Sequence, residues 1–260
     1  MEKITSRANS LLVHMKKLAA SAAYRREQGV YLCDSPKLLA EALKWHAPVR
    51  EIAVTVGTAL PPIPESIRAV EVPEDVMASI SPMKSPQGAL FTVALPSGEV
   101  PATLPGSRYM VLDGVQDPGN VGTIIRTMDA AGFTGLLMDE KTADPYAPKP
   151  LRASMGGVFR IPALRCESLP QQLDALAKAG YAVIAGDLHG QPFYDRPPMP
   201  DKVCVVIGNE GAGVSPAVLE KATLRLKLPI PGKAESLNAA VAGSIMMYDL
   251  LRETLGKRRD

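Results

Sequence analysis

Apolar residues recur at intervals of three and four between residues 7 and 28, and this spacing predicts an amphipathic helix. The basic pairs Lys16–Lys17 and Arg25–Arg26 then fall largely on its solvated side. A helix over 36–45 begins with Pro36, which suits a first helical turn. Short apolar runs predict strands at 30–33, 52–56, 69–72 and 89–94. Strands that alternate with helices indicate a small α/β domain over residues 1–95.

A linker is predicted at residues 96–107, PSGEVPATLPGS, because its three prolines and two glycines disfavour both helix and ladder pairing. Beyond it, apolar runs predict strands at 109–112, 135–138, 182–185, 203–207 and 224–228, with helices at 120–131, 170–179 and 234–255. These strands are almost wholly apolar instead of alternating, which is typical of a parallel sheet covered on both faces. A second α/β domain is therefore expected over residues 108–260.

The net charge of +2 is too small to indicate nucleic acid by itself. Residues 1–28, however, hold six basic and two acidic side chains, a local excess of +4. Such a segment favours phosphate contacts, although a basic N-terminus is also compatible with an organellar transit peptide. No apolar run reaches the length of about 18 residues that a membrane-spanning helix needs.

The chain has three cysteines, Cys33, Cys166 and Cys204, with no CxxC pair and no histidine nearby. This arrangement argues against a disulfide framework and against a zinc site, so no metal is expected. It is compatible with a reducing cytoplasm.

Three strand–loop–helix segments of the second domain carry the candidate chemistry. The first, VLDGVQDPGNVGTIIRTMDAAG (111–132), passes through a Gly/Pro turn into a helix whose free N–H groups can meet a polar or anionic ligand. Asn120 and Arg126 are six residues apart, so both can lie toward one side of that helix. A capping asparagine and a surface arginine without a ligand remain the alternative.

The second segment, VCVVIGNEGAGVS (203–215), is an apolar strand followed by Gly208, Gly211 and Gly213. Their GxxGxG spacing differs from the GxGxxG of a dinucleotide-binding turn, and no Walker lysine follows. The glycines either let the backbone approach a ligand or simply make a sharp turn. Glu210 in this loop is expected to bind backbone amides or orient a partner, and not to act as a base.

The third segment, LKLPIPGKAESLNAAVAGSIMMYDLLR (226–252), leads from a strand through a Pro–Gly loop into a long helix. Ser236 or Asn238 suits its N-terminus, and the small residues that follow permit close helix packing. A tightly packed, capped helix without a ligand would look the same.

In order and spacing the three segments resemble motifs 1, 2 and 3 of the SpoU branch of the SPOUT superfamily of RNA methyltransferases. The family's N-x-G-x-x-x-R is present as Asn120, Gly122 and Arg126, and its G-x-E-x-x-G as Gly208, Glu210 and Gly213. LPIPGKAESLN approximates the third motif, with Ala239–Ala240 where the family more often has Val–Ser. PKPLRASMGGVFRIP (148–162) also resembles the family, and ITSRANSLLVHMKKL and VYLCDSPKLLAEAL resemble, more weakly, the substrate-binding extension of its rRNA-directed members.

The resemblance implies an α/β fold whose C-terminal domain has a mainly parallel sheet and a deep trefoil knot. It also implies that S-adenosylmethionine is held by the loops of motifs 2 and 3, largely through backbone groups. Carried over position by position, the cofactor-binding residues are Gly186, Leu188, Gly208, Leu228, Ile230 and Leu237. Adenine needs an apolar slot with backbone hydrogen bonds, and these residue types supply one.

The implied reaction is methyl transfer to a ribose 2′-hydroxyl, with catalytic residues Asn120, Arg126, Glu210, Ser236 and Asn238. An arginine, whose pKa exceeds about 12, is a poor base at neutral pH. Our hypothesis is that Arg126 anchors phosphate and stabilises the developing alkoxide, while solvent or a phosphate oxygen takes the proton.

The resemblance further implies an RNA substrate, rRNA in preference to tRNA, and a homodimer formed through the long C-terminal helix. The candidate RNA-binding residues are Arg7, Lys16, Lys17, Arg25, Arg26, Lys149 and Arg152. Three alternatives stay open: a tRNA 2′-O-methyltransferase, a methyltransferase that acts on a base nitrogen, and a catalytically silent RNA-binding protein.

Overall fold

The computed structural model describes residues 1–98, 100–101 and 103–257, which form two compact units. Unit 1 comprises Met1–Ser97 together with Tyr146–Arg160, and unit 2 comprises Gly98–Pro145 and the chain from Ile161 onward. The first division falls inside the Pro- and Gly-rich segment 96–107. Residues 146–160, which the sequence placed in the second domain, belong to unit 1 by their contacts.

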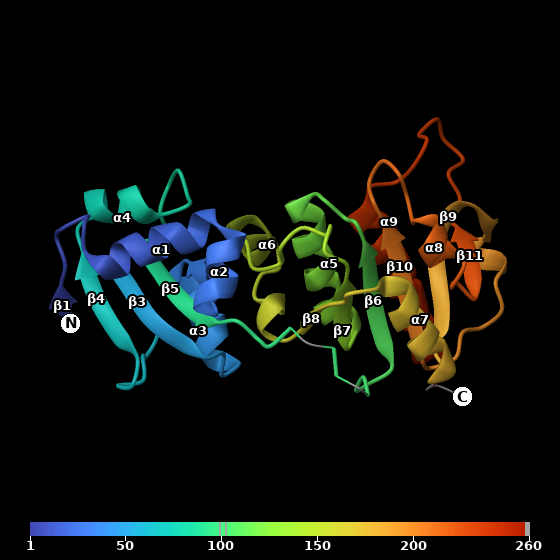
Figure 1. Ribbon diagram of the computed structural model, residues 1–260, viewed down its shortest axis with the longest axis horizontal. Coiled ribbons are helices and arrows are strands. Elements are labelled where there is room, and N and C mark those ends of the chain that lie inside the picture. The colour runs from blue at the N-terminus through green and yellow to red at the C-terminus, as the bar shows by residue number, and fades with distance from the viewer. Residues whose placement is uncertain (99, 102, 258–260) are drawn as a thin grey trace. The chain divides into compact units, whose positions relative to one another are not determined.

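Unit 1 is built on a five-stranded sheet in the order β1-β4-β3-β5-β2 (Figure 1). Its strands are β1 (Glu2–Lys3), β2 (Val30–Asp34), β3 (Val49–Thr55), β4 (Arg68–Val72) and β5 (Ala89–Ala94). Its helices are α1 (Ser10–Ala20), α2 (Ala22–Gln28), α3 (Pro36–Lys44), α4 (Glu74–Ile80) and α6 (Pro148–Ala153), followed by the 3-10 turn η1 (Gly157–Phe159). The β1–β4 and β4–β3 pairs are parallel, whereas β5 is antiparallel to β3 and β2.

The single helix expected between residues 7 and 28 is in fact two helices that meet at Ser21. Ser21 has extended dihedrals, φ −129° and ψ 118°, so its N–H closes α1 on Lys17 while its side chain accepts the N–H of Tyr24 to start α2. The resulting corner buries Arg25, which is 4% exposed and donates from Nη1 to the Leu18 carbonyl at 2.6 Å. The expectation that Arg25 lies on the solvated side is therefore wrong.

Unit 2 is built on a six-stranded sheet in the order β11-β9-β10-β6-β7-β8 (Figure 1). Its strands are β6 (Arg108–Asp113), β7 (Gly135–Met138), β8 (Ala163–Arg165), β9 (Ala182–Pro192), β10 (Val203–Gly208) and β11 (Leu224–Lys227). Its helices are α5 (Pro118–Ala131), α7 (Leu169–Lys178), α8 (Pro216–Leu219) and α9 (Ala239–Lys257), with a 3-10 turn η2 (Phe193–Asp195). Every pairing between these strands is parallel, which confirms the sheet type that the apolar runs predicted.

Helices cover both faces of the unit 2 sheet. On one face, strand residues such as Val111 and Val206 form a core with Leu173 of α7 and Val218 of α8. On the other face α5 packs against α9, and α9 approaches β10. Both faces are thereby withdrawn from water, the arrangement that wholly apolar parallel strands require. No helix among the described residues is long and apolar enough to cross a membrane.

Helix α9 begins at Ala239 and not at residue 234 as its pattern suggested, because Asn238 caps it. The Asn238 Oδ1 accepts the N–H groups of Ala240 at 3.0 Å and Val241 at 3.2 Å. Residues 229–237 consequently stay in a loop, which is the loop of the third motif.

Candidate active site

The motif loops leave the sheet of unit 2 at one edge, where the carboxyl ends of its parallel strands meet. β6 ends at Asp113 and β10 at Gly208, and these two residues are direct partners in the ladder. The loops that follow them are side by side, and Asp113 accepts the N–H of Ser215 at 2.6 Å across the gap. Ligands of open α/β sheets bind outside the carboxyl ends of the strands, so this edge is the natural place for a site.

A chain of hydrogen bonds joins the three motifs. The side-chain amide of Asn238 donates to Asn120 Oδ1 at 2.9 Å, and Asn120 Nδ2 donates in turn to Glu210 Oε1 at 2.9 Å. Glu210 also accepts the backbone N–H groups of Gln116 at 3.0 Å and Asp117 at 2.9 Å. Both of its carboxylate oxygens are therefore engaged with the loop of the first motif.

These bonds set the charge state of Glu210. Partial burial by itself raises the pKa of this carboxyl, but the backbone N–H groups of Gln116 and Asp117 and the amide of Asn120 lower it more. The pKa of Glu210 ends below its ordinary value. An ionised, fully engaged carboxylate orients its neighbours and is a poor proton acceptor, in agreement with the role expected from the sequence.

Arg126 lies on α5, exposed to solvent, and its guanidinium forms no hydrogen bond or ion pair with another described residue. The next residue of α5, Thr127, faces α9, where it shares a hydrogen bond of 3.1 Å with Ser244. The structure thus brings Asn120, Glu210 and Asn238 together and leaves Arg126 available to a group outside the chain. Ser236 is exposed in the loop before α9.

A cavity of about 370 Å³, the loop cavity, opens among the loops of the second and third motifs. All six residues expected to bind the cofactor line it: Gly186, Leu188, Gly208, Leu228, Ile230 and Leu237. Glu210 and Ser236 line it as well, whereas Asn120, Arg126 and Asn238 do not. The remaining lining includes Asn209, Lys227 and Met246.

Glycine at position 208 is required by the close approach of two backbones. A Cβ added there would lie 2.1 Å from the Gly213 carbonyl carbon and from the Val214 nitrogen. Gly211 has no such neighbour, since only the Asn209 side chain comes within 3.7 Å. The wall of the loop cavity at Gly208 is thus backbone, able to offer hydrogen bonds to a planar ring.

The charges of the loop cavity suit S-adenosylmethionine. Three carboxylates line it, Asp187, Glu210 and Glu235, against one ammonium group, Lys227. The cofactor has a sulfonium and an ammonium group against one carboxylate, so it carries a net positive charge that this lining favours. Nucleotides with a net negative charge, such as ATP or NAD, would meet net repulsion there.

Asn209 is a site residue that the sequence did not single out. Its Oδ1 accepts the N–H groups of Gly211 and Ala212, both at 3.0 Å, and its Nδ2 donates to the Gly114 carbonyl at 2.8 Å. It therefore shapes the second motif loop and ties it to the first. Asparagine side chains commonly accept backbone N–H groups two residues on in a turn. An asparagine before a glycine-rich turn is therefore a sequence signal from which the role of Asn209 could have been predicted.

The expected RNA-binding residues all lie in unit 1. Lys16, Lys17 and Arg26 are exposed, and Arg7 is exposed but pairs with Asp75 at 2.7 Å. Arg25 is buried, as described above. Lys149 and Arg152 are on α6, and Arg152 Nη1 pairs with the buried Asp34 at 3.1 Å.

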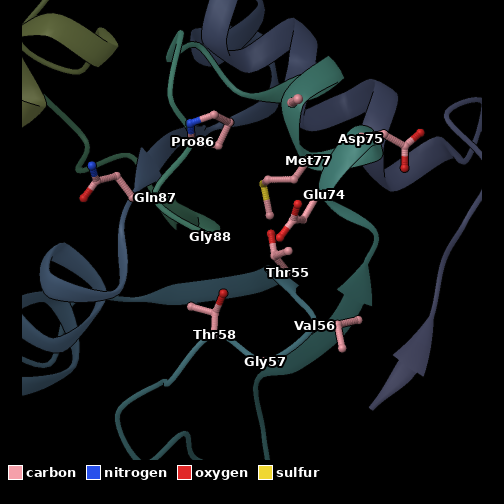
Figure 2. Close-up of a pocket in the computed structure, with 11 residues that line it drawn as sticks. Thr55, Val56, Gly57, Thr58, Glu74, Asp75, Met77, Pro86, Gln87 and Gly88 are labelled. Atoms are coloured by element: carbon pink, nitrogen blue, oxygen red, sulfur yellow. The ribbon is translucent and has the colours of Figure 1, made fainter.

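Unit 1 also has an open groove of about 980 Å³ where β3 ends and β5 begins, beside the start of α4. Figure 2 shows Thr55, Glu74 and Met77 gathered at its centre. Its lining contains two carboxylates, Glu74 and Asp75, and no lysine or arginine. This groove therefore suits neither RNA nor an anionic nucleotide.

No group of three or more potential metal ligands occurs among the described residues.

A profile described as the SpoU rRNA Methylase family matches residues 107–248, more than half of the chain. The chain belongs to the SpoU rRNA methylase family. The matched region contains Asn120, Arg126, Glu210, Ser236 and Asn238 and every residue of the loop cavity. A second profile, the MRM3-like substrate binding domain, matches residues 9–90 within unit 1.

Relatives of this SpoU family member cover nearly its whole length. It is 36% identical over 251 residues to the 23S rRNA (guanosine(2553)-2′-O)-methyltransferase RlmP of Bacillus subtilis, covering 96% of this chain and 99% of that one. A putative RNA methyltransferase of the TrmH family from Porphyromonas gingivalis superposes with a TM-score of 0.85 at 31% identity, covering 94% of this chain and 98% of the other.

An AdoMet-bound rRNA methyltransferase from Sinorhizobium meliloti also superposes with a TM-score of 0.85, at 29% identity, covering 96% of this chain and 97% of the other. The resemblance of the three motif segments to the SpoU family is thereby confirmed, as is the α/β fold with a mainly parallel sheet.

Proposed function

We propose that this SpoU family member is an S-adenosylmethionine-dependent methyltransferase that modifies a ribose 2′-hydroxyl of ribosomal RNA. The observation that carries the proposal is the loop cavity, lined by backbone at Gly208 and by three carboxylates, next to the Asn238–Asn120–Glu210 chain. An rRNA substrate is supported by the similarity to RlmP and by the substrate-binding profile over residues 9–90.

The bound cofactor would supply a methyl group already activated by its sulfonium. The protein then has to place the ribose hydroxyl in line and assist the loss of its proton. None of the three histidines lines the loop cavity, and Glu210 is held ionised by its hydrogen bonds. Arg126, exposed and without a partner among the described residues, anchors an RNA phosphate and stabilises the developing alkoxide. Solvent or a phosphate oxygen accepts the proton.

We further propose a homodimer formed through α9. Val241, Tyr248 and Leu255 are large apolar residues on this helix, all about half exposed and spaced seven residues apart. A seven-residue interval repeats on nearly the same side of a helix, so the three residues form one apolar stripe. Such a stripe is suited to a second copy of the helix, related by a two-fold axis.

The trefoil knot and the cytoplasmic location also stay proposals. The knot is supported by membership of the SpoU family and by the parallel strand order in unit 2. The location is supported by the three buried free cysteines, which are typical of a reducing compartment.

The test is calorimetry of cofactor binding. S-adenosylmethionine, or its demethylated product, should bind near stoichiometrically, and ATP and NAD should not. Gly208→Ala should abolish binding, because the new methyl group would displace the Gly213–Val214 backbone. Gly232→Ala in the third motif loop is the matched control and should bind normally, because Gly232 does not line the loop cavity and no atom lies within 4 Å of its added Cβ. Absence of cofactor binding in the wild-type protein, with or without RNA, would favour a silent RNA-binding protein instead.

A further inference from the structure

Unit 1 contains a second, smaller cavity, the α3 cavity, of about 250 Å³. Its apolar walls come from Leu38, Met83 and Met155, while Asp34 and Arg152 contribute polar groups. All of these residues belong to unit 1, since Arg152 and Met155 lie in the segment 146–160. A concave apolar space with a few convergent polar groups is the usual form of a site for a small planar ligand.

The polar pair in the α3 cavity offers an acceptor and a donor side by side. Arg152 Nη1 donates to Asp34 Oδ2 at 3.1 Å, and the Asp34 side chain is only 7% exposed. A carboxylate accepts N–H groups of a nucleobase and a guanidinium donates to its carbonyl, which matches the edge of guanine. The sulfur atoms of Met83 and Met155 suit contact with an aromatic ring.

Trp45, at the C-terminal end of α3, is the single tryptophan of the sequence and is 48% exposed. The Arg160 guanidinium lies 5.1 Å from its ring centroid, and Lys44 Nζ lies 5.8 Å from it. Arg160 is held in turn by Glu41 at 3.0 Å, and Glu41 lines the α3 cavity. An exposed indole with a fixed guanidinium beside it is a stacking platform for an unpaired base.

The charges around these two features favour an anionic partner. Asp34 and Glu41 are each paired with an arginine. Lys37, which lines the α3 cavity, and Lys44 have no carboxylate partner among the described residues. The α3 cavity and the surroundings of Trp45 therefore keep an excess of positive charge, which attracts phosphates and disfavours a basic protein.

The backbone around the same features adopts unusual conformations. Among the described residues, the non-glycine positions with positive φ are Ser35 at 82°, His46 at 55° and Met155 at 50°. Ser35 and Met155 line the α3 cavity, and His46 follows Trp45 directly. Residues in sparsely populated backbone regions gather at ligand-binding sites, where the surrounding structure holds them in place.

We propose that the α3 cavity and Trp45 together bind unpaired nucleotides of the RNA substrate: one base enters the α3 cavity beside Asp34 and Arg152, and another base stacks on Trp45. The inference rests on the proposed function, because it takes RNA as the substrate. It adds to that function a base-binding subsite in unit 1, separate from the loop cavity of unit 2, where the methyl donor would bind.

The tryptophan emission of the full-length protein reports on this subsite, because Trp45 supplies all of it. The probe is an unpaired oligoadenylate with one central guanosine, compared with a blunt-ended RNA duplex that has the same number of phosphates. The unpaired probe should quench the emission saturably, and the duplex should leave it nearly unchanged even where it binds. Unchanged emission with bound unpaired RNA would overturn the proposal, as would quenching by polylysine and not by RNA.

Three substitutions sharpen the test. Trp45→Ala should weaken binding of the unpaired probe by about ten-fold, which is typical of the loss of one stacked base. Trp45→Phe, which keeps an aromatic ring, should restore most of the affinity. Met155→Ala should weaken binding of the probe that contains guanosine more than binding of plain oligoadenylate. Val56→Ala, an exposed apolar residue of unit 1 outside the α3 cavity, is the control and should change neither.

Cofactor affinity measured without RNA separates this inference from the proposed function. It should be unchanged in all four variants, since none of the substituted residues lines the loop cavity. If the wild-type protein binds cofactor and methylates rRNA while Trp45→Ala binds the probe normally, the subsite is wrong and the function stands. If the wild-type protein binds no cofactor but its emission is quenched as expected, the function is wrong and the subsite stands.

Discussion

The side chain of Asn238 donates a hydrogen bond to the side chain of Asn120 at 2.9 Å, across 118 residues of sequence. This bond joins the start of α9 to the first turns of α5, and Asn120 passes the connection on to Glu210. Asn238 donates to Asn120, and Asn120 donates to the carboxylate of Glu210, so both bonds run in the same direction. The ionised state of Glu210 thus fixes the orientation of both amides and so aligns the three motif loops.

The two roles of Asn238, donor and helix cap, can be separated by substitution. Asn238→Asp keeps an oxygen that can cap α9 but places a second acceptor against Asn120 Oδ1, so methyl transfer should fall strongly while stability changes little. Asn238→Ala should lose the cap as well, at a cost of about 1 kcal/mol in unfolding free energy. Thermal unfolding and single-turnover assays measure the two effects.

Ser168→Ala provides the control, because Ser168 caps α7 through the N–H of Gln171, away from the site. It should lower stability by a similar amount and leave methyl transfer intact. Normal activity of Asn238→Asp would show that the Asn238–Asn120 bond is dispensable.

Glu210→Gln should reveal how the lowered pKa of this carboxyl supports the fold. A carboxyl whose pKa is lower in the folded state stabilises the protein above its unfolded pKa, about 4.3 for glutamate. That stabilisation is lost as the pH falls through the lowered folded value. The difference in unfolding free energy between wild type and Glu210→Gln should therefore be constant from neutral pH to about pH 5 and shrink below about pH 4.

Urea unfolding at a series of pH values tests this prediction, with Glu167→Gln, an exposed glutamate of unit 2, as the control. A difference that does not change with pH would mean that the hydrogen bonds of Glu210 do not depend on its charge.

Arg126→Ala should reduce methyl transfer by about two orders of magnitude or more, as expected for the loss of a group that stabilises a developing anion. Cofactor affinity should stay within a few-fold, because Arg126 does not line the loop cavity. Arg126→Lys should rescue little, since a single ammonium cannot reproduce the planar guanidinium on phosphate and hydroxyl. Single-turnover kinetics and calorimetry give the two quantities, and Lys178→Ala on α7 is the control. A near-normal rate for Arg126→Ala would remove this residue from the mechanism.

Reversal of Lys16 and Lys17 to glutamate should weaken RNA binding across all sequences, because both side chains are exposed and would contact phosphates. Each lost contact should lower the salt slope of binding by roughly 0.7 to 0.9. Filter binding over a salt series measures this slope, and an unchanged slope would show that the two lysines make no phosphate contacts.

Arg25→Ala should behave differently and lower the unfolding free energy by about 2 kcal/mol, because the buried hydrogen bond of Arg25 to the Leu18 carbonyl is lost.

Much of the local structure follows from the sequence. The strands Ala89–Ala94 and Gly135–Met138 lie at the residues predicted, because each is a short apolar run bounded by glycine, proline or polar residues. The cofactor residues carried over from the SpoU resemblance all line one cavity. They come from three separate segments, which meet because a parallel sheet brings the carboxyl ends of its strands to one edge.

The sequence by itself thus determined the family, most helices and strands of unit 2 and the residue types at its site, since these depend on local patterns and motif spacing. The short elements β8 and α8 were not predicted. Only the tertiary structure decided that Ser21 divides the first helix, that Arg25 is buried and that residues 146–160 pack with unit 1. Tyr146 lies against Tyr31, with ring centroids 4.8 Å apart, and Arg160 pairs with Glu41. Deletion of residues 1–95 would therefore remove the packing partners of this segment. Burial depends on contacts between residues far apart in the chain, and a pattern read over one short window does not contain them.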